Sequence, residues 1–386
     1  MNQKVKIMYS INNNNKKTIV ISAVNLVEGG ALTILIDCIE YLVKLSTRYN
    51  IFILVNNKSL FEDKYKTIKF IEFPKSKKYY FYRLYYEYIY FRKFSRQIKP
   101  YLWLSLHDIS PNVNAVIKAV YCHNPSPFND VSIEQLFSMP KYFFFGLFYK
   151  YLYKINIKKN NYVIVQQNWL KKEFVKSYNL KNEKVIVALP EYINKDFLDK
   201  NFDVTDQSDR FKFIYSSFPR PFKNFEVICN AVKYLNSNYD LNFEVILTIS
   251  GLENKYSNEL LKKYQNQKNI KFIGLQSKEK IFDLYNNCDV LIFPSKLETW
   301  GLPITEFKLF KKPIIVADLP YAKETIGKYD ASVKFKVDDY IQLALIMKTF
   351  ISKENVAYDI TEDIVYNQPH SKSWKELFKI LLNGNS

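Results

Sequence analysis

The stretch Val290-Leu-Ile-Phe-Pro-Ser-Lys-Leu-Glu-Thr-Trp-Gly-Leu-Pro-Ile-Thr-Glu306 decides the fold of this chain. Its first four residues form a short apolar run, which is typical of a strand buried on both faces of a parallel sheet. Pro294 and Ser295 end the run, and a loop leads to a helix with Pro303 in its first turn, where proline is tolerated. A strand, a loop and a helix in this order indicate a doubly wound α/β domain.

Outward from this stretch, strand-like and helix-like segments alternate along most of the chain. Strands are expected at 18–24, 51–55, 68–72, 101–106, 116–121, 162–166, 184–188, 211–217, 243–250, 270–274, 290–294 and 313–317. The bounded helical patterns are 31–44, 224–236, 256–266, 278–287, 302–311, 339–351 and 373–382. Two successive series of this kind predict an α/β protein with two doubly wound, Rossmann-like domains that face a central cleft.

The polar segment 195–210 interrupts the alternation and predicts a linker between the two domains. The N-terminal domain is then 1–198 and the C-terminal domain is 208–366. The last helix, within 370–386, is expected to pack back on the N-terminal domain. A length of 386 residues suits this division.

The chain has 56 Lys and Arg against 38 Asp and Glu, a formal charge of +18. This surplus favours anionic partners, although a lysine-rich codon bias explains it equally well. No recognised nucleic-acid motif is present, so we expect no nucleic-acid partner. A hydrophobic fraction of 48% excludes a disordered chain.

The four cysteines are far apart and fit neither a disulfide framework nor a Cys-x-x-Cys metal site. The first 17 residues lack the apolar core of a signal peptide, and no apolar run is long enough to span a bilayer. We therefore expect a cytoplasmic protein with reduced thiols and no metal site. The inner face of the cytoplasmic membrane is the alternative location within the cytoplasm.

Two carboxylates flank the start of the helix that follows the opening strand. Glu298 is on the loop at the carboxyl end of the strand, and Glu306 is about one turn into the helix. Carboxylates accept hydrogen bonds from sugar hydroxyls, and free N–H groups at a helix start can hold a phosphate. The alternative is that Glu306 only complements the helix dipole.

This stretch, together with Lys312-Pro-Ile-Ile-Val-Ala-Asp318, resembles the Glu-x7-Glu signature of the retaining GT-B glycosyltransferases of the group 1 or family 4 type. The resemblance covers 211–328 well and the N-terminal half weakly. It implies that the C-terminal domain, 208–366, binds a nucleotide-sugar donor and that the N-terminal domain, 1–198, binds the acceptor. It implies that Glu298, a catalytic residue, contacts the donor sugar and that Glu306 holds the ribose. It also implies that Thr299, Trp300, Gly301 and Leu302 offer backbone N–H groups near the sugar and the diphosphate; the family more often has Phe in place of Trp300.

The segment Tyr215-Ser-Ser-Phe-Pro-Arg-Pro-Phe-Lys-Asn224 is similar to a second motif of that family. The resemblance implies that Arg220, Lys223 and Asn224 bind the donor diphosphate and that Lys223 is catalytic. A guanidinium and an ammonium can neutralise a leaving nucleoside diphosphate. The family's arginine more often lies five residues before the lysine, where this chain has Phe218, and both basic residues can also be read as surface residues.

Three glycines at the ends of strands are further candidates. Gly29 and Gly30 lie between a strand and a helix, where glycine lets the backbone approach a ligand. They resemble the family's first loop, which faces the donor phosphate and the acceptor. Gly274 resembles the family's turn near the nucleobase, but it and Gly251 can equally be simple turn glycines.

His123 closes the strand 116–121 and resembles the family's histidine beside the transferred sugar. It can hydrogen-bond a sugar hydroxyl and stabilise developing charge, so it is a third catalytic candidate; a structural role is the alternative. Asn124, Gln166 and Asn168 are weaker candidates for contact with the acceptor.

Two tracts, 75–96 and 141–159, mix aromatic and basic residues at helical spacing. This composition suits peripheral contact with an anionic membrane, as in family members that extend lipid-linked saccharides. The same residues also suit helices that face the core.

The resemblance implies transfer, with retention, of a hexose or deoxyhexose from a nucleoside-diphosphate sugar to a saccharide acceptor. We expect that acceptor to be lipid-linked, as in the synthesis of lipopolysaccharide, O-antigen or capsule. The resemblance implies no cofactor and no essential metal, and no Asp-x-Asp metal motif is present. The leaving phosphate itself is expected to take the acceptor proton, so no nucleophilic carboxylate is required. The alternative is a nucleotide-sugar epimerase of the same fold, which should turn over donor without acceptor.

Overall fold

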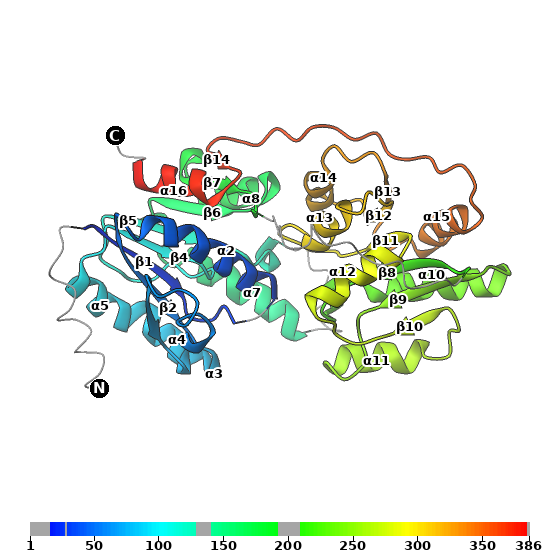
Figure 1. Ribbon diagram of the computed structural model, residues 1–386, viewed down its shortest axis with the longest axis horizontal. Helices are drawn as coiled ribbons and strands as arrows, with labels where there is room; N and C mark the ends of the chain where they lie inside the picture. Colours follow the sequence, from blue (N-terminus) through cyan, green and yellow to red (C-terminus); the bar gives the residue numbers. More distant parts are fainter. Residues whose placement is uncertain (1–15, 28, 129–139, 192–208, 384–386) are drawn as a thin grey trace. The chain divides into compact units, whose positions relative to one another are not determined.

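The computed structural model describes residues 16–27, 29–128, 140–191 and 209–383, with backbone only for 140–145. The chain divides into two compact units, one of Met1–Glu191 with Tyr366–Ser386 and one of Tyr192–Val365 (Figure 1). Most of the linker predicted at 195–210 lies outside the described residues.

The first unit is built on an eight-stranded sheet with the order β14-β7-β6-β5-β4-β1-β2-β3. Every strand pairing in it is parallel. Its strands are β1 (Thr18–Ala23), β2 (Asn50–Val55), β3 (Lys69–Glu72), β4 (Leu102–Ser105), β5 (Ile117–Tyr121), β6 (Tyr162–Val165), β7 (Val185–Ala188) and β14 (His370–Ser371).

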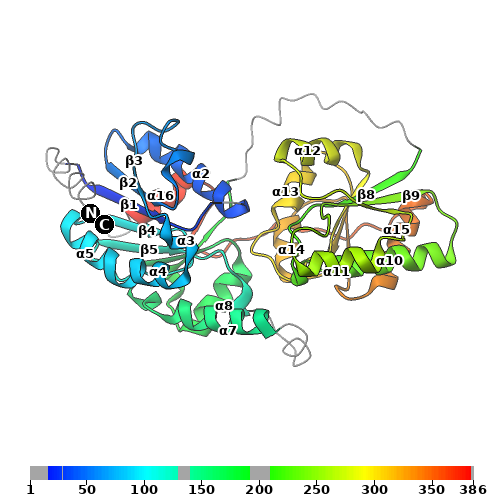
Figure 2. The same ribbon diagram turned by 90° about the horizontal axis from the view of Figure 1, so that it is seen from below.

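Helices cover both faces of this sheet (Figures 1 and 2). The longer ones are α2 (Gly29–Leu45), α4 (Tyr80–Tyr85), α5 (Phe91–Ile98), α7 (Pro140–Lys154), α8 (Asn168–Tyr178) and α16 (Trp374–Asn383). The short ones are η1 (Lys58–Leu60), α3 (Lys75–Lys78), the π-helix η2 (Tyr86–Tyr90), η3 (Ser126–Phe128), η4 (Ile157–Lys159) and η5 (Asn182–Lys184).

Alternation along β1 shows why both faces must be covered. Ile19 and Ile21 pack with α2 and α16 on one face, whereas Val20 packs with α5 on the other. All three side chains are fully buried. Because successive side chains of a strand point to opposite faces, a continuous apolar run requires helices on both sides.

The second unit is built on a six-stranded sheet with the order β10-β9-β8-β11-β12-β13, again wholly parallel. Its strands are β8 (Phe211–Tyr215), β9 (Phe243–Leu247), β10 (Ile270–Phe272), β11 (Val290–Phe293), β12 (Ile314–Ala317) and β13 (Ser332–Phe335). Its helices are η6 (Pro221–Lys223), α10 (Phe225–Asn238), α11 (Lys255–Tyr264), α12 (Lys278–Asn287), α13 (Leu302–Lys308), α14 (Pro320–Ile326) and α15 (Tyr340–Ile351).

Both sheets grow outward from a central strand in two directions, which is the doubly wound order of Rossmann-like domains. The predicted fold class is therefore confirmed in each unit. The sequence did not predict β13, β14 or α14, which are short and carry little apolar periodicity. Helix α13 ends at Lys308 rather than at the predicted Lys311, whose backbone has the left-handed φ of 54°.

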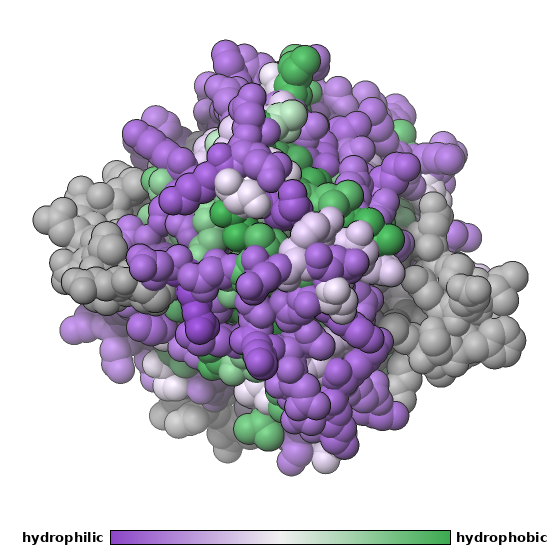
Figure 3. Space-filling model, turned by 90° about the vertical axis from the view of Figure 1, so that its right-hand side faces the viewer, coloured by the Kyte–Doolittle hydropathy of each residue, from purple (hydrophilic) through white to green (hydrophobic). Residues whose placement is uncertain are grey.

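No helix in the described part of the chain combines the length and the apolar character that crossing a membrane requires. Hydrophilic side chains dominate the face of the molecule seen from the right-hand side of Figure 1, with apolar side chains gathered near its middle (Figure 3). Part of the apolar surface of the second unit comes from α15, which leaves Ile341 and Leu345 exposed.

Candidate functional site

Each sheet has one place where the chain changes the direction in which it adds strands. In the second sheet this place lies between β8 and β11, which are neighbours although two strands separate them in the sequence. Ligands of doubly wound sheets bind at the carboxyl ends of the strands at such a switch point. The loop after β8 contains Arg220, Lys223 and Asn224, and the loop after β11 contains residues 298–301, so the structure brings these predicted donor-binding residues to one edge.

The loop after β11 ends at Gly301, the residue before the first turn of α13. Its φ of 85° lies in the left-handed region, which favours glycine. A Cβ at this position would lie 3.3 Å from Phe293 Cε1 and 3.3 Å from Ile304 Cδ1. Glycine therefore permits both the backbone turn and the close packing of the loop on β11.

Lys223 and Glu298, two of the predicted catalytic residues, are in direct contact. Lys223 Nζ donates a charge-assisted hydrogen bond to Glu298 Oε1, and the side chains are only 17% and 13% exposed. The Lys223 backbone is also held, because its carbonyl accepts a hydrogen bond of 2.9 Å from the Tyr215 hydroxyl. The pair places an ammonium, which can neutralise a phosphate, beside a carboxylate, which can accept from sugar hydroxyls.

Arg220 and Asn224 flank Lys223 but differ in their surroundings. Arg220 is exposed, and its guanidinium lies over the rings of Phe218 and Phe222, with the carbon Cζ 5.7 and 5.9 Å from their centroids. Asn224 is buried and has the left-handed φ of 57°. Its amide nitrogen donates to the carbonyls of Val337 (2.7 Å) and Pro294 (3.3 Å), a structural role that the sequence did not reveal.

Glu306, on α13, is connected to the loop after β8 through the side chain of Tyr285. Its Oε2 is 3.4 Å from the hydroxyl of Tyr285 on α12, which in turn is hydrogen-bonded to Ser216 Oγ. Ser216 is the first residue after β8. Glu306 thus lies at the same edge of the sheet as Lys223, and its contact with a ribose stays a prediction. Tyr285 and Ser216 are partners that the sequence did not identify.

Gly274 follows β10 on the same edge of the sheet. Its φ is 73°, and its N–H donates to the Ile249 carbonyl at 3.1 Å. A Cβ would be in ordinary contact with Ser250 at 3.4 Å. The backbone conformation alone therefore accounts for glycine here, and contact with a nucleobase stays a prediction.

Helix α14, which the sequence did not predict, holds both ends of the Glu298 loop. The Tyr321 hydroxyl donates to the Ser295 carbonyl at 2.6 Å, and Thr325 Oγ1 donates to the Trp300 carbonyl. Both donors are buried and lie four residues apart, so they share one face of the helix. Trp300 is further held by a 2.9 Å hydrogen bond from its indole N–H to Thr305. We name Tyr321 and Thr325 the loop clamp.

The switch point of the first sheet lies between β1 and β4. Gly29 and Gly30 follow β1, begin α2 and are exposed. Gly29 has the φ of 67°, and a Cβ on it would have no neighbour within 4 Å. Glycine is thus required at residue 29 by backbone conformation and not by packing.

His123 lies just beyond β5, one strand away from this switch point. Its ring stacks on Tyr121 with centroids 4.4 Å apart, and its Nε2 has no hydrogen-bond partner among the described residues. Burial lowers the pKa of His123, whereas the Asp108 carboxylate and the Leu106 carbonyl raise it by smaller amounts. The imidazole is therefore neutral near pH 7, with one nitrogen left without a partner.

The three weaker acceptor candidates are all engaged within the first unit. The Asn124 N–H donates to Asp108 Oδ1 at 3.0 Å. Gln166 is buried, and its hydrogen bond to the Tyr121 hydroxyl offsets only part of the effect of burial, which raises the pKa of that hydroxyl. Asn168 Oδ1 accepts from the Asn367 N–H at 2.8 Å, which fastens the segment that returns from the second unit. Contact of these three residues with an acceptor stays a prediction.

A buried polar cluster lies beneath the carboxyl end of β4 and was not predicted. His107 Nε2 is 2.9 Å from Ser22 Oγ and 3.2 Å from Glu87 Oε1, while Arg83 approaches His107 Nδ1 at 3.3 Å. A guanidinium only donates, so Nδ1 accepts and the proton is on Nε2. Burial raises the pKa of Glu87 to about 8, so its carboxyl group is protonated at neutral pH.

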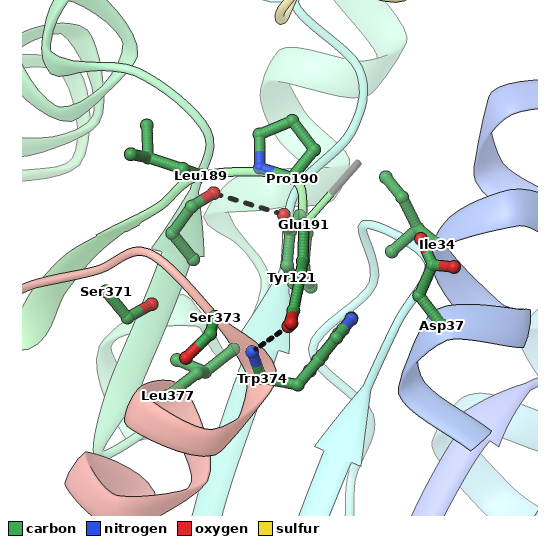
Figure 4. Close-up of a pocket in the computed structure, with 11 residues that line it drawn as sticks. Ile34, Asp37, Tyr121, Leu189, Pro190, Glu191, Ser371, Ser373, Trp374 and Leu377 are labelled. Atoms are coloured by element: carbon green, nitrogen blue, oxygen red, sulfur yellow. Dashed lines mark hydrogen bonds between the residues drawn. The ribbon is translucent and has the colours of Figure 1, made fainter. Parts of the chain in front are cut away.

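A small pocket opens at the carboxyl ends of β5, β7 and β14 (Figure 4). It is lined by the carboxylates of Asp37 and Glu191 and by the rings of Tyr121 and Trp374. Its volume of about 10 Å³ suits one water molecule. Glu191 accepts a 2.8 Å hydrogen bond from the backbone N–H of Trp374. This bond connects the end of the first segment of the first unit, at Glu191, to the start of helix α16.

Comparison with known families places this geometry in context. Residues 197–367 match the family "Glycosyl transferases group 1". The O-antigen chain mannosyltransferase RfbU of Salmonella typhimurium is 23% identical over 191 residues, which are 49% of this chain and 51% of that protein. The chain thus matches about half the length of this curated relative.

Solved structures share the fold of nearly the whole chain. A glycosyltransferase from Rickettsia africae is 19% identical, with a TM-score of 0.62 over 88% of this chain and 89% of that one. HepE from Anabaena, in complex with UDP and glucose, is 15% identical, with a TM-score of 0.59 over 87% and 90%. The predicted GT-B fold of two Rossmann-like domains is therefore confirmed, and the family match supports a group 1 glycosyltransferase.

Proposed function

We propose that this protein transfers a hexose or deoxyhexose from a nucleoside-diphosphate sugar to a saccharide acceptor, with retention of configuration. The observation that carries the proposal is the contact between Lys223 and Glu298 at the switch point of the second sheet. The match of residues 197–367 to the group 1 glycosyltransferases and the structural likeness to HepE, which was solved with UDP and glucose, support a nucleotide-sugar donor.

In this proposal the second unit holds the donor. Glu298 accepts hydrogen bonds from hydroxyls of the sugar, and Glu306 accepts from those of the ribose. Lys223 and Arg220 neutralise the diphosphate, assisted by backbone N–H groups of residues 299–302. The partly buried position of the Lys223–Glu298 pair strengthens these interactions, because exposed charges are screened by water.

The chemical step exchanges one bond for another on the same face of the sugar. The bond between the anomeric carbon and the phosphate oxygen breaks, and a bond from that carbon to the acceptor oxygen forms. The acceptor proton passes to the leaving phosphate, so the products are the glycosylated acceptor and the nucleoside diphosphate. Lys223 stabilises the charge on the leaving group, and we propose that neither a protein nucleophile nor an essential metal is needed.

We further propose that His123 hydrogen-bonds a hydroxyl of the transferred sugar. The His123 imidazole is neutral near pH 7 and its Nε2 has no hydrogen-bond partner among the described residues, which suits this role. In this proposal the His123 imidazole contributes to transfer by orienting the sugar and not by carrying a charge.

The proposed acceptor is lipid-linked, as the likeness to an O-antigen mannosyltransferase suggests. The two basic-aromatic tracts support this proposal because each is partly buried and partly exposed. Phe81 on α4 and Tyr151 on α7 are 75% and 62% exposed, and the Tyr80 and Phe148 rings, 5.3 Å apart, join the two helices. Exposed Lys75, Lys77 and Lys78 of α3 adjoin α4 in the sequence. We call these residues the aromatic-basic face and propose that it contacts an anionic membrane.

A panel of UDP-, GDP- and dTDP-sugars, each incubated with lipid-linked saccharides, tests the proposal. Release of nucleoside diphosphate that depends on both donor and acceptor is the expected result. Conversion of the sugar without an acceptor would instead indicate an epimerase, and absence of turnover across the panel would refute the proposed transfer.

A further inference from the structure

Asp108 collects three hydrogen bonds on a single carboxylate oxygen. Its Oδ1 accepts from the backbone N–H of His123 at 2.6 Å and from that of Asn124 at 3.0 Å. It also accepts from the hydroxyl of Tyr153, on α7, at 2.7 Å. Since hydrogen bonds to an ionised acceptor are the stronger kind, this oxygen is a firm attachment point for the loop after β5.

The backbone of Asp108 is adapted to this task. Its φ is 70°, in the left-handed region, where aspartate is tolerated better than most residues. Its N–H donates to the Tyr121 carbonyl at 3.1 Å. Asp108 is thus bound to the end of β5 through its backbone and to the loop beyond β5 through its side chain.

These contacts set the position of the His123 ring. The backbone N–H of His123 is held by Asp108, and the ring lies flat against Tyr121, the last residue of β5. Tyr153 is buried, so the whole arrangement rests on the packed face formed by α7 and α8. The ring is therefore held from its backbone and on one of its faces.

We propose that Asp108 is a positioning residue that orients His123 and Asn124 at the carboxyl edge of the first sheet; its consequence for catalysis rests on the proposed sugar transfer. Asp108 follows β4, which borders the switch point of that sheet, and links the loop after β4 to the loop after β5. The negative charge has a second effect, because it raises the pKa of His123 against the lowering effect of burial.

Two variants separate the effect of the hydrogen-bond acceptor oxygen of Asp108 from the effect of its negative charge. Asp108→Gly keeps a residue that adopts the left-handed backbone but removes the acceptor oxygen. Asp108→Asn keeps an oxygen in the same place, tolerates the same backbone and removes the charge. Asn179→Gly is the matched control, because Asn179 has a φ of 49° at the end of α8 and its replacement removes no contact with the loop.

The first measurement is amide hydrogen exchange at His123 and Asn124, which needs no enzymatic activity. In Asp108→Gly we expect exchange at both amides to become at least about tenfold faster than in Asn179→Gly, and Asp108→Asn to restore most of the protection. The histidine NMR spectrum, simple because the chain has only three histidines, should show a lower titration midpoint for His123 in Asp108→Asn. Unchanged exchange in Asp108→Gly would overturn the proposal.

The second measurement is steady-state transfer with the donor identified by the panel. We expect kcat to fall about 10- to 100-fold in Asp108→Gly with donor KM within about threefold, and Asp108→Asn to recover kcat to within about threefold of wild type. Unchanged kcat in Asp108→Gly would overturn the catalytic part of the proposal. If the wild-type protein transfers no sugar at all, the proposed function fails, while the exchange measurement still decides whether Asp108 positions the loop.

Discussion

Lys223 and Glu298 lie 75 residues apart in the sequence, yet the ammonium of one donates directly to the carboxylate of the other. The contact exists because β8 and β11 are neighbours in the second sheet, so the loops after both strands leave the same edge. The two side chains are only 17% and 13% exposed, and the ion pair fixes the position of both. A nucleotide-sugar that binds them therefore does not have to immobilise them itself.

The first prediction concerns the two left-handed glycines at the starts of helices, Gly301 before α13 and Gly29 in α2. Gly301→Ala should destabilise the protein by about 2 kcal/mol or more, because the new Cβ meets Phe293 and Ile304 in addition to the backbone penalty. Gly29→Ala should cost only the backbone penalty of about 1 kcal/mol, because no atom lies near its Cβ. Urea denaturation of both variants checks the order, and a larger loss in Gly29→Ala would contradict the described packing.

The second prediction concerns the loop clamp. Tyr321→Phe and Thr325→Val each remove a donor to a carbonyl of the Glu298 loop, and each should lower kcat/KM for the donor by about tenfold. The double variant should lose less than the product of the two effects, because either change releases the same loop.

The control for the loop clamp is Tyr329→Phe. It removes a similar hydrogen bond, 2.7 Å long, to the Lys312 carbonyl in the same unit. Transfer by this variant should stay within about threefold of wild type even where its stability falls. An equal loss of transfer in the control would show that the clamp acts only through general stability.

Part of the candidate site could be predicted from the sequence, and part of it could not. The strand-loop-helix order placed Lys223 and Glu298 at the carboxyl ends of strands, and that much depends only on local apolar periodicity. Their contact also requires β8 and β11 to be neighbours in the sheet. That pairing depends on the crossover connections of the chain, which neither segment predicts by itself. The loop clamp was missed because α14 is a seven-residue helix whose donors matter only after tertiary packing.

The first unit gives the same lesson. Asp108 follows a predicted strand just as His123 does, so its position was available as a signal. Its role was not, because that role rests on a left-handed backbone and on partners 15 to 45 residues away.

The third prediction concerns pH and the buried carboxyl of Glu87. Burial raises its pKa from 4.5 to about 8 in the folded protein, despite the opposing effect of Arg83. Between these values the folded state binds more protons than the unfolded state, so this group's contribution to stability is full below about pH 4.5 and is lost as pH rises through about 8.

Glu87→Gln keeps a neutral side chain of the same shape at every pH. The stability of wild type relative to this variant should therefore fall between pH 5 and pH 8, with a slope of at most about 1.4 kcal/mol per pH unit. Urea midpoints of both proteins across this range check the sign. Glu62→Gln, an exposed carboxylate paired with Lys58, is the control and should show no such trend; a flat difference for Glu87→Gln would contradict the neutral carboxyl.

The fourth prediction concerns the aromatic-basic face. Binding to vesicles that contain anionic lipid should weaken about tenfold when Phe81 and Tyr151 are both replaced by serine, because each buries apolar surface in the interface. Replacement of Lys77 and Lys78 by glutamine should weaken binding to a similar extent and only on anionic vesicles. Ile360→Ser, at a residue 90% exposed in the second unit, should leave binding unchanged. Cosedimentation measures all three, and undiminished binding of the aromatic variant would refute the proposed surface.

The transfer rate of Glu298→Ala, compared with wild type on the donor and acceptor that the panel identifies, tests the central claim most directly. The control is Lys348→Ala on α15 in the same unit, which breaks a surface ion pair of 3.1 Å with Glu354 and should keep the wild-type rate. We expect Glu298→Ala to lose at least about 100-fold in rate while its thermal unfolding stays close to that of the control. A wild-type rate of sugar transfer in Glu298→Ala would contradict the assignment of the donor site to the Lys223–Glu298 pair.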